Sequence, residues 1–223
     1  MSFELSLTSI DPVTHDTFRL RFPRPSSYTF KPGQATELSL KKEGWENEAR
    51  PFTFTSLPGE DLLEFIIKSY PSHNGMTEQI PSLKPGDKVS IGDAWGAIED
   101  RGPGVFIAGG AGITPFIAIL RQRHADAGNL EGYKLLFSNK KQEDIILRPE
   151  LQSMPGLDMC LTLSDENVPG INHGHIDDAF INDNINDFAE PFYVCGPPPM
   201  EEAVSDILKR RGVADNQIVR EED

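Results

Sequence analysis

A change in the spacing of apolar residues near position 101 constrains this chain more than any other feature of its sequence. Before that point apolar and polar residues alternate, as in segments 3–7 and 18–22, and breaks such as Pro32-Gly33 separate the runs. A period of two is typical of half-buried strands, and several short strands with turns between them indicate an antiparallel barrel or sandwich. We predict an N-terminal domain over residues 1–100, with one short helix at 76–80.

From residue 101 onward, short apolar runs alternate with segments of helical spacing. The runs predict strands at 105–108, 133–138, 157–163, 192–195 and 217–220, and helices at 114–127, 148–153, 176–181 and 198–211. Strands alternating with helices are typical of a doubly wound parallel sheet. The predicted fold class is therefore two domains: an N-terminal antiparallel β-barrel (1–100) and a C-terminal α/β doubly wound parallel sheet (101–223).

Composition excludes several classes of function. The 223 residues carry a formal net charge of −14, which argues against binding nucleic acid, whose phosphates require Lys and Arg. The two cysteines, Cys160 and Cys195, are too few for an iron–sulfur cluster or a disulfide framework. His173 and His175 lack further ligands at metal-binding spacing, so we expect no metal site.

Neither the N-terminus nor the longest uncharged segment indicates a membrane protein. The first residues show no basic region followed by an apolar one, as a signal peptide would. Residues 102–120 are uncharged but include five glycines and two prolines, which suit a strand, a turn and a helix better than a spanning helix. We therefore expect no membrane span and a cytoplasmic location.

The glycine-rich turn at 106–115, Phe-Ile-Ala-Gly-Gly-Ala-Gly-Ile-Thr-Pro, is the most informative motif. Its glycines allow close backbone approach after a strand, and Thr114 is expected to cap a helix with Pro115 in its first turn. Amides and the dipole at such a terminus suit a pyrophosphate. The same turn also occurs where a helix simply packs on a strand, and Pro115 stands where Gly-x-Gly-x-x-Gly has its third glycine.

A second motif, Arg50-Pro-Phe-Thr53, alternates a cation, an aromatic ring and a hydroxyl along a predicted strand. Arg50 suits a phosphate through charge-assisted hydrogen bonds. Phe52 suits the face of a fused ring, and Thr53 suits a ring nitrogen. A plain strand with one aromatic face is the alternative interpretation of these residues.

The third motif is the segment 192–200, in which a strand ends at Cys195 and is followed by Gly196 and three prolines. A thiol at the carboxyl end of a parallel strand faces the crevice in which such sheets bind ligands. Cysteine is also among the residues most often buried, so a purely structural thiol is the alternative.

Taken together, in this order and spacing, the motifs resemble the ferredoxin–NADP reductase superfamily, and within it most closely the NADH-dependent cytochrome reductases and the bacterial flavin and flavodoxin reductases. The resemblance covers nearly the whole chain. It rests on Arg50-Pro-Phe-Thr53, on Gly75-Met-Thr77 before 83–89, and on the segments 109–115, 137–146 and 195–200.

The resemblance implies an FAD site in the first domain and an NAD(P)H site in the second. Arg50 would bind the flavin phosphates, Phe52 would pack on the isoalloxazine, Thr53 would bond N5, and Cys195 would lie beside N5 and the nicotinamide C4. Thr53 and Cys195 would be the catalytic residues. The expected cofactor-binding residues are Arg50, Pro51, Phe52, Thr53, Ile67, Lys68, Gly75, Met76, Thr77, Gly110, Ala111, Gly112, Ile113, Thr114, Cys195, Gly196, Pro197 and Met200.

Three departures from the family pattern qualify these expectations. Phe52 replaces the usual tyrosine and removes a hydroxyl that would contact the flavin, so we expect weaker flavin retention. No aromatic residue follows Tyr193, unlike the plant-type members, which favours the cytochrome-reductase or bacterial branch. Lys140 and Lys141 could hold a 2′-phosphate, but the pattern at Asn139 is similar to that of NADH-using relatives, which slightly favours NADH.

The implied function is that of an NAD(P)H-dependent, FAD-containing reductase. Hydride would pass from NAD(P)H to bound FAD, and electrons would then pass to a separate acceptor, either a protein (ferredoxin, flavodoxin or cytochrome) or a small molecule. Two alternatives stay open: a flavin reductase that uses free flavin as its substrate, and a non-catalytic electron-transfer subunit of a larger complex.

Overall fold

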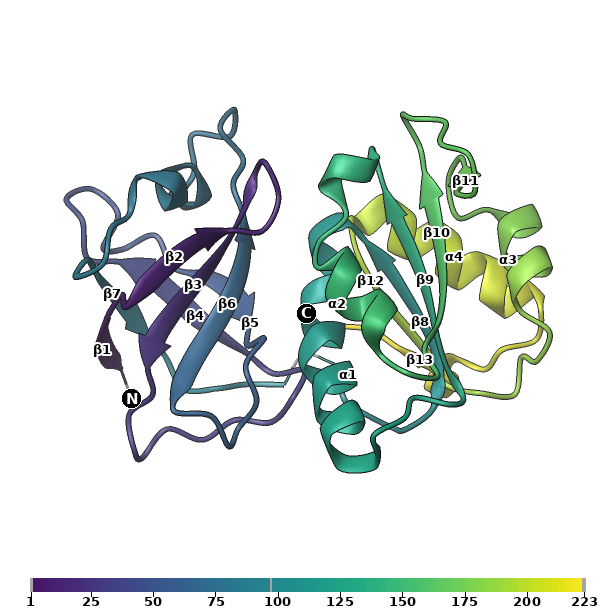
Figure 1. The fold of residues 1–223 in the computed structure, drawn as a ribbon, viewed down its shortest axis with the longest axis horizontal. Coiled ribbons are helices and arrows are strands. Elements are labelled where there is room, and N and C mark those ends of the chain that lie inside the picture. Colours follow the sequence, from purple (N-terminus) through teal and green to yellow (C-terminus); the bar gives the residue numbers. More distant parts are fainter. Residues whose placement is uncertain (1, 97, 222–223) are drawn as a thin grey trace.

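The computed structural model describes residues 2–96 and 98–221, which form two sets of β-sheet lying side by side. The N-terminal half is antiparallel, and the C-terminal half is a parallel sheet with helices on both faces (Figure 1). This arrangement confirms the predicted fold class.

The N-terminal half consists of two antiparallel sheets around one apolar core. Their orders are β1-β7-β4-β5 and β2-β3-β6, and a bridge between Phe54 and Phe65 joins them. Phe22, Phe54 and Phe65 are fully buried between the sheets. The elements are β1 (Phe3–Ser6), β2 (Ser9–Pro12), β3 (Thr17–Pro23), β4 (Ala35–Leu40), β5 (Arg50–Thr53), β6 (Leu62–Lys68), the 3-10 helix η1 (Met76–Ser82) and β7 (Lys88–Ile91).

The C-terminal half is a six-stranded parallel sheet of order β11-β10-β9-β8-β12-β13. Chain order reverses between β8 and β12, and ligands bind at such a switch point in sheets of this kind. The strands are β8 (Gly104–Gly109), β9 (Tyr133–Asn139), β10 (Asp158–Leu163), β11 (Asn172–His173), β12 (Phe192–Cys195) and β13 (Ile218–Val219). The helices are η2 (Gly110–Ile113), α1 (Thr114–Ala127), η3 (Gln142–Asp144), α2 (Arg148–Ser153), α3 (Asp178–Asn184), α4 (Pro198–Arg210) and η4 (Asp215–Gln217).

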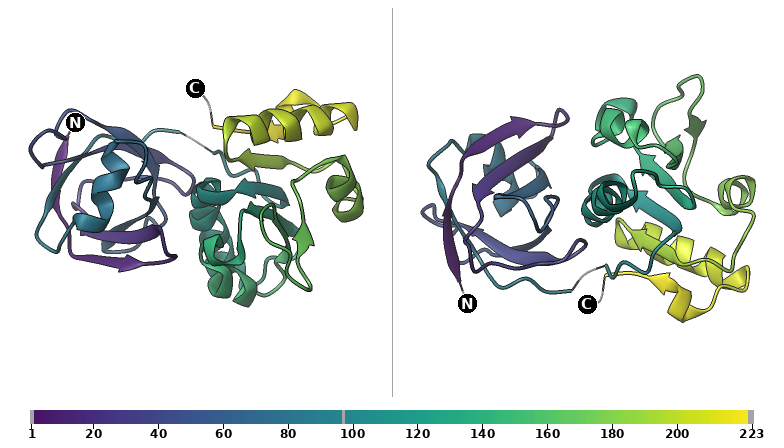
Figure 2. Two further views of the ribbon diagram at one scale, coloured as in Figure 1. Left: turned by 90° about the horizontal axis from the view of Figure 1, so that it is seen from above. Right: turned by 60° about the horizontal axis from the view of Figure 1, so that its bottom comes forward.

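The four α-helices divide between the two faces of the parallel sheet. Residues of α1 and α2 share one core cluster, and residues of α3 and α4 share the other. The face that carries α1 and α2 is turned toward the N-terminal half, as Figures 1 and 2 show. The predicted domain boundary at 100/101 stays a prediction. The segment just before it is hydrogen-bonded to the N-terminal half, since Ile98 N–H donates to Gly33 O at 3.1 Å.

Three elements differ from the sequence prediction. The helix expected at 176–181 begins at Asp178, because Asp177 caps it by accepting from Phe180 N–H. His173, for which no strand was predicted, pairs with Leu163 as part of β11. The last strand is shorter than 217–220, because Gln217 ends the 3-10 helix η4.

Strand β6 shows why its alternation is imperfect in the sequence. Leu63, Phe65 and Ile67 face the N-terminal core, but Glu64 and Ile66 are also buried. Ile66 belongs to the core cluster of the C-terminal half. The second face of β6 is therefore covered by the other half of the molecule, not by solvent.

Candidate functional site

A pocket of about 400 Å³ brings together two motifs that are separated in the sequence. The start of β5 forms one wall and the start of η1 forms the other. Arg50 contributes a half-exposed guanidinium, and a Cβ added at Gly75 would approach no atom closer than 3.9 Å, so the backbone there is open to a ligand. The lining residues are Arg50, Pro51, Phe52, His73, Gly75, Met76 and Thr77.

This pocket fits the phosphates of a flavin nucleotide. It combines a cation with backbone that is open at Gly75, and Met76 is anchored in the core, only 1% exposed. The Arg50 guanidinium pairs with a carboxylate of the same chain, since its Nη2 lies 2.8 Å from Glu48 Oε2. Because that pair is exposed, its contribution to stability is small and a phosphate can replace the carboxylate.

The rest of β5 extends from this pocket into the sheet. Phe52 lies opposite Thr36 and Thr53 lies opposite Ala35 on the neighbouring strand β4. Phe52 packs against the apolar core while also lining the pocket, and Thr53 is 7% exposed. Arg50 and Phe52 both line the pocket, whereas Thr53 follows Phe52 in the strand, points to the opposite face and is not among the residues that line it.

Ile67 and Lys68, also expected to bind a cofactor, lie away from this row. The Ile67 side chain is buried in the N-terminal core. Lys68 Nζ lies 2.9 Å from Asp16 Oδ2 and 4.0 Å from Asp144 Oδ1, at the contact between the two halves.

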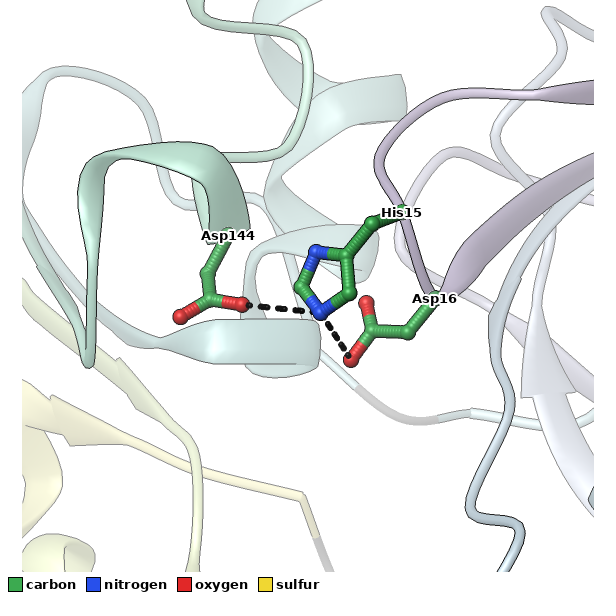
Figure 3. Close-up of side chains that lie close together, drawn as sticks. All are labelled: His15, Asp16 and Asp144. Atoms are coloured by element: carbon green, nitrogen blue, oxygen red, sulfur yellow. Dashed lines mark ion pairs between the residues drawn. The ribbon is translucent and has the colours of Figure 1, made fainter.

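His15 completes that contact, with its imidazole between the Asp16 and Asp144 carboxylates in Figure 3. Its Nε2 lies 3.6 Å from Asp16 and 3.7 Å from Asp144. These three side chains come close enough together to ligate a metal ion. The Lys68 ammonium already supplies positive charge to both carboxylates, so the cluster is an internal ion-pair network that joins the halves.

At the carboxyl end of the parallel sheet, glycines bring two motifs into direct contact. A Cβ on Gly112 would overlap the Cys195 carbonyl and lie 2.7 Å from Gly196 Cα. One on Gly109 would lie 2.9 Å from Pro197 Cδ and would overlap the Met200 sulfur. Gly109 and Gly112 therefore bring the turn that holds Gly110, Ala111, Ile113 and Thr114 against the segment of Cys195, Gly196, Pro197 and Met200, as the two motifs require if they form one site.

The start of α1 differs from the prediction in one detail. Thr114 does not cap the helix; the residue at the N-cap position is Ile113, and Thr114 Oγ1 donates to Ala111 O at 3.0 Å. The reason is that Gly110–Ile113 already form a 3-10 turn that runs directly into α1. The Thr114 hydroxyl consequently stabilises the glycine turn.

Cys195 is buried, with 6% of its surface exposed, and its Sγ lies 3.9 Å from Glu221 Oε1. Burial raises the pKa of the thiol far above its ordinary value, and the carboxylates of Glu221 and Glu201 raise it further. The thiol is therefore neutral at physiological pH and cannot act as a nucleophile. The Cys195 thiol can therefore serve the site only by contacting and positioning a neighbouring group.

A larger cavity of about 1060 Å³ lies between the two halves and reaches this end of the sheet. Glu201 and Glu221, which flank Cys195, line it together with Gln34 and Ile98 from the N-terminal side. Among the described residues that line this cavity, none is an expected cofactor-binding residue, so we do not assign it to the flavin or the nucleotide.

Asn139 is a residue that the list of expected site residues omitted. It ends β9, directly after Ser138, which pairs with Gly109 at the start of the glycine turn. The residue is 5% exposed, and within residues 2–96 and 98–221 neither its Oδ1 nor its Nδ2 has a hydrogen-bond partner. Buried amides are normally paired, so these two atoms suit a ligand with both a donor and an acceptor. The sequence feature that could have identified Asn139 as a site residue is its position as a polar residue at the end of a buried strand.

The structure thus has a pocket lined by a cation on its antiparallel half and a close-packed glycine turn on its parallel half. Comparison with known families agrees. Residues 2–86 match the FAD-binding domain model, and residues 106–206 match the oxidoreductase NAD-binding domain model.

Individual relatives point the same way. The chain is 30% identical over 226 residues to NADH-cytochrome b5 reductase 2 of Mycosarcoma maydis, covering 91% of this chain and 63% of that protein. It is 28% identical over 230 residues to the reductase component of propane 2-monooxygenase from Rhodococcus jostii (strain RHA1), covering 95% of this chain and 61% of that protein. The CS-b5R domains of human Ncb5or superpose with a TM-score of 0.85 at 28% identity, covering 98% of this chain and 68% of that one. The chain therefore combines an FAD-binding domain with an oxidoreductase NAD-binding domain, which is what its resemblance to the ferredoxin–NADP reductase superfamily implied.

Proposed function

We propose that this chain is a reductase that takes hydride from NAD(P)H onto bound FAD and delivers electrons to a separate acceptor. The observation that carries the proposal is the joint presence of the Arg50 pocket and the Gly112–Cys195 contact on facing halves. The chain spans 63% and 61% of the lengths of the two curated relatives above, so its own activity and partners are proposals.

Each residue of the site has a role in this reaction. Bound FAD would supply the ability to accept a hydride and release electrons singly. Arg50 and the open backbone at Gly75 hold its phosphates, and Thr53 offers a hydroxyl to the ring. The glycine turn holds the nucleotide, and the neutral thiol of Cys195 packs beside the reacting rings, so that the protein contributes positioning.

We propose that NADH is the preferred donor and that the Asn139 side chain hydrogen-bonds to a ribose hydroxyl of NADH. An unpaired buried carboxamide both donates and accepts, as a ribose hydroxyl does. Lys140 and Lys141 are exposed, and Lys141 lies 3.8 Å from Glu143. A 2′-phosphate would have to compete for that lysine.

The proposed partner is a redox protein or a small acceptor. The Rhodococcus relative is named as the reductase component of a monooxygenase system, which supports a separate acceptor. Among the residues described, no helix is long and apolar enough to cross a bilayer. We keep the cytoplasm as the proposed location on the sequence grounds given above.

A second candidate, reduction of free flavin, is favoured by two features of the pocket. Phe52 has no hydroxyl where the family pattern has a tyrosine, and the Glu48 carboxylate pairs with the Arg50 guanidinium. Both weaken the hold on FAD. Gel filtration after loading distinguishes the two: a resident cofactor elutes with the protein, whereas a substrate flavin separates from it.

Anaerobic absorbance titration of the FAD-loaded protein with NADH and, separately, with NADPH tests the proposal. We expect the flavin band near ~450 nm to bleach, and faster with NADH. A protein that takes up no FAD would refute the flavoprotein proposal.

Replacing Arg50 with alanine should raise the Kd for FAD by about tenfold or more, because a hydrogen bond to a charged group is worth roughly 1.5–3 kcal/mol. Fluorescence titration of the ligand-free protein measures this. Lys41→Ala, which removes an exposed cation elsewhere on the loop before β5, should leave the Kd within twofold. Equal losses in both variants would show a nonspecific charge effect.

Replacing Cys195 with alanine should leave FAD binding intact and slow reduction by NADH by about tenfold or more. The reason is that contact beside the reacting rings is lost while the Arg50 pocket is untouched. Stopped-flow absorbance at saturating NADH gives the rate. Reduction at the parental rate would remove Cys195 from the proposed catalytic residues.

A further inference from the structure

One guanidinium joins the two halves of the molecule through hydrogen bonds to both. Arg121, on α1 and 18% exposed, donates through Nη1 to Thr55 O at 2.6 Å and to Glu64 Oε1 at 2.8 Å. Its Nε and Nη2 bind both oxygens of Glu150 on α2, at 2.6 and 2.9 Å. Its donors therefore tie the N-terminal strands to the two helices on the facing side of the parallel sheet.

The partners of Arg121 are themselves fixed. Glu64 is 6% exposed and also accepts from Thr55 Oγ1 at 3.0 Å and from Arg21 Nε at 3.0 Å. Although burial opposes ionisation, Arg121 and Arg19 hold the pKa of Glu64 below its ordinary value. The pair is therefore charged and immobile, and a bidentate guanidinium adds geometric definition that an ammonium lacks.

The position of Arg121 connects the two proposed cofactor sites through rigid elements. Thr55, whose carbonyl it binds, is two residues along an extended segment from Thr53, a separation of about 7 Å. Thr114, where α1 leaves the glycine turn, is seven residues back along the helix, about 10 Å away. One side chain thus sets the placement of the Thr53 segment relative to the nucleotide turn.

We propose that Arg121 is a positioning residue for hydride transfer, holding the Thr53 segment and the glycine turn in register across the contact between the halves. This inference rests on the proposed function. Hydride transfer requires reacting atoms at about 3–3.5 Å, and an error of about 1 Å can cost a hundredfold in rate. Neither proposed binding site contains Arg121, so affinity and rate should respond differently to its loss.

The test compares three variants of the full chain with the parent. Arg121→Met combined with Glu64→Gln removes the tie without leaving a buried unpaired carboxylate. Arg121→Lys keeps the charge but cannot reach Thr55, Glu64 and both oxygens of Glu150 together, and it serves if the double variant fails to fold. Arg210→Met is the matched control, because Arg210 pairs with Asp178 entirely within the C-terminal half.

Two readouts separate positioning from general structure. In the FAD-loaded protein, stopped-flow reduction should slow by tenfold or more in the double variant and by less in Arg121→Lys, with the Kd values for FAD and NADH within threefold of the parent. In the ligand-free protein, hydrogen exchange of segment 50–56 should speed up in both, while the control changes neither readout.

Parental rates and exchange in both Arg121 variants would overturn the inference. So would a loss of FAD affinity in parallel with rate, which would make Arg121 a support of the flavin pocket alone. If the parent itself fails to reduce FAD, the proposed function falls. The exchange measurement then still decides whether Arg121 orders segment 50–56.

Discussion

Replacing Gly112 with alanine is expected to slow reduction of bound FAD by NADH about a hundredfold while leaving FAD affinity unchanged. The added methyl would overlap the Cys195 carbonyl and lie 2.7 Å from Gly196 Cα. Both contacts are backbone, which cannot rotate out of the way as a side chain can. The glycine turn and the Cys195 segment must therefore separate, and both belong to the proposed nicotinamide site.

Stopped-flow absorbance gives the rate, and fluorescence titration gives the Kd for FAD. Gly59→Ala is the matched control, since a Cβ there would meet nothing within 4 Å, and it should match the parent within twofold. Parental reduction by the Gly112 variant would show that this contact has no part in binding the donor.

Replacing Glu64 with leucine should lower the free energy of unfolding by about 3–5 kcal/mol, because it removes a buried carboxylate that accepts from two arginines and leaves Arg121 paired with Glu150 alone. Arg121 and Arg21 both donate to this carboxylate at 2.8 and 3.0 Å. The melting temperature should fall by about 10 °C in a calorimetric scan. Glu46→Leu, at an exposed carboxylate in the loop before β5, should change it by a degree or two at most. A Glu64 variant as stable as the parent would mean that Arg121 and Arg21 find other partners.

The same residue predicts how stability depends on pH. The pKa of Glu64 is lowered from its ordinary 4.5 in the folded state. Its contribution is therefore complete above about pH 4.5 and is lost as pH falls through the lower folded value. The difference in melting temperature between the parent and Glu64→Gln should shrink on acidification below pH 4.5, and a constant difference would contradict this assignment.

Much of the fold was predictable from local patterns. Helix α1 lies at the residues that its spacing indicated, and β3 and β12 follow the period-two and apolar runs from which they were expected. These elements bury one face or both faces within a single core, so their sequence reports their surroundings directly. Strand β6 does not, because Glu64 and Ile66 face the other half of the chain.

The motifs of the candidate site could be predicted from the sequence, but the contacts between their residues could not. Arg50 and Thr77 could be assigned to one pocket only through family resemblance, since nothing local to either segment indicates the other. Arg121 was missed, and Asn139 was used only as a sign of NADH preference, for a related reason: their roles depend on which groups lie opposite them in space. A buried arginine in an amphipathic helix looks like a solvent-facing cation until its partners are placed.

Both cysteine thiols of the chain are held in an unreactive form, which matters for a protein that would handle electrons in air. Burial raises the pKa of the Cys160 thiol as well as that of Cys195, so each is held in its protonated form. Peroxide attacks thiolates much faster than thiols. Cys195 can therefore lie beside the proposed flavin site and still resist oxidation by the peroxide that forms when reduced flavin reacts with oxygen.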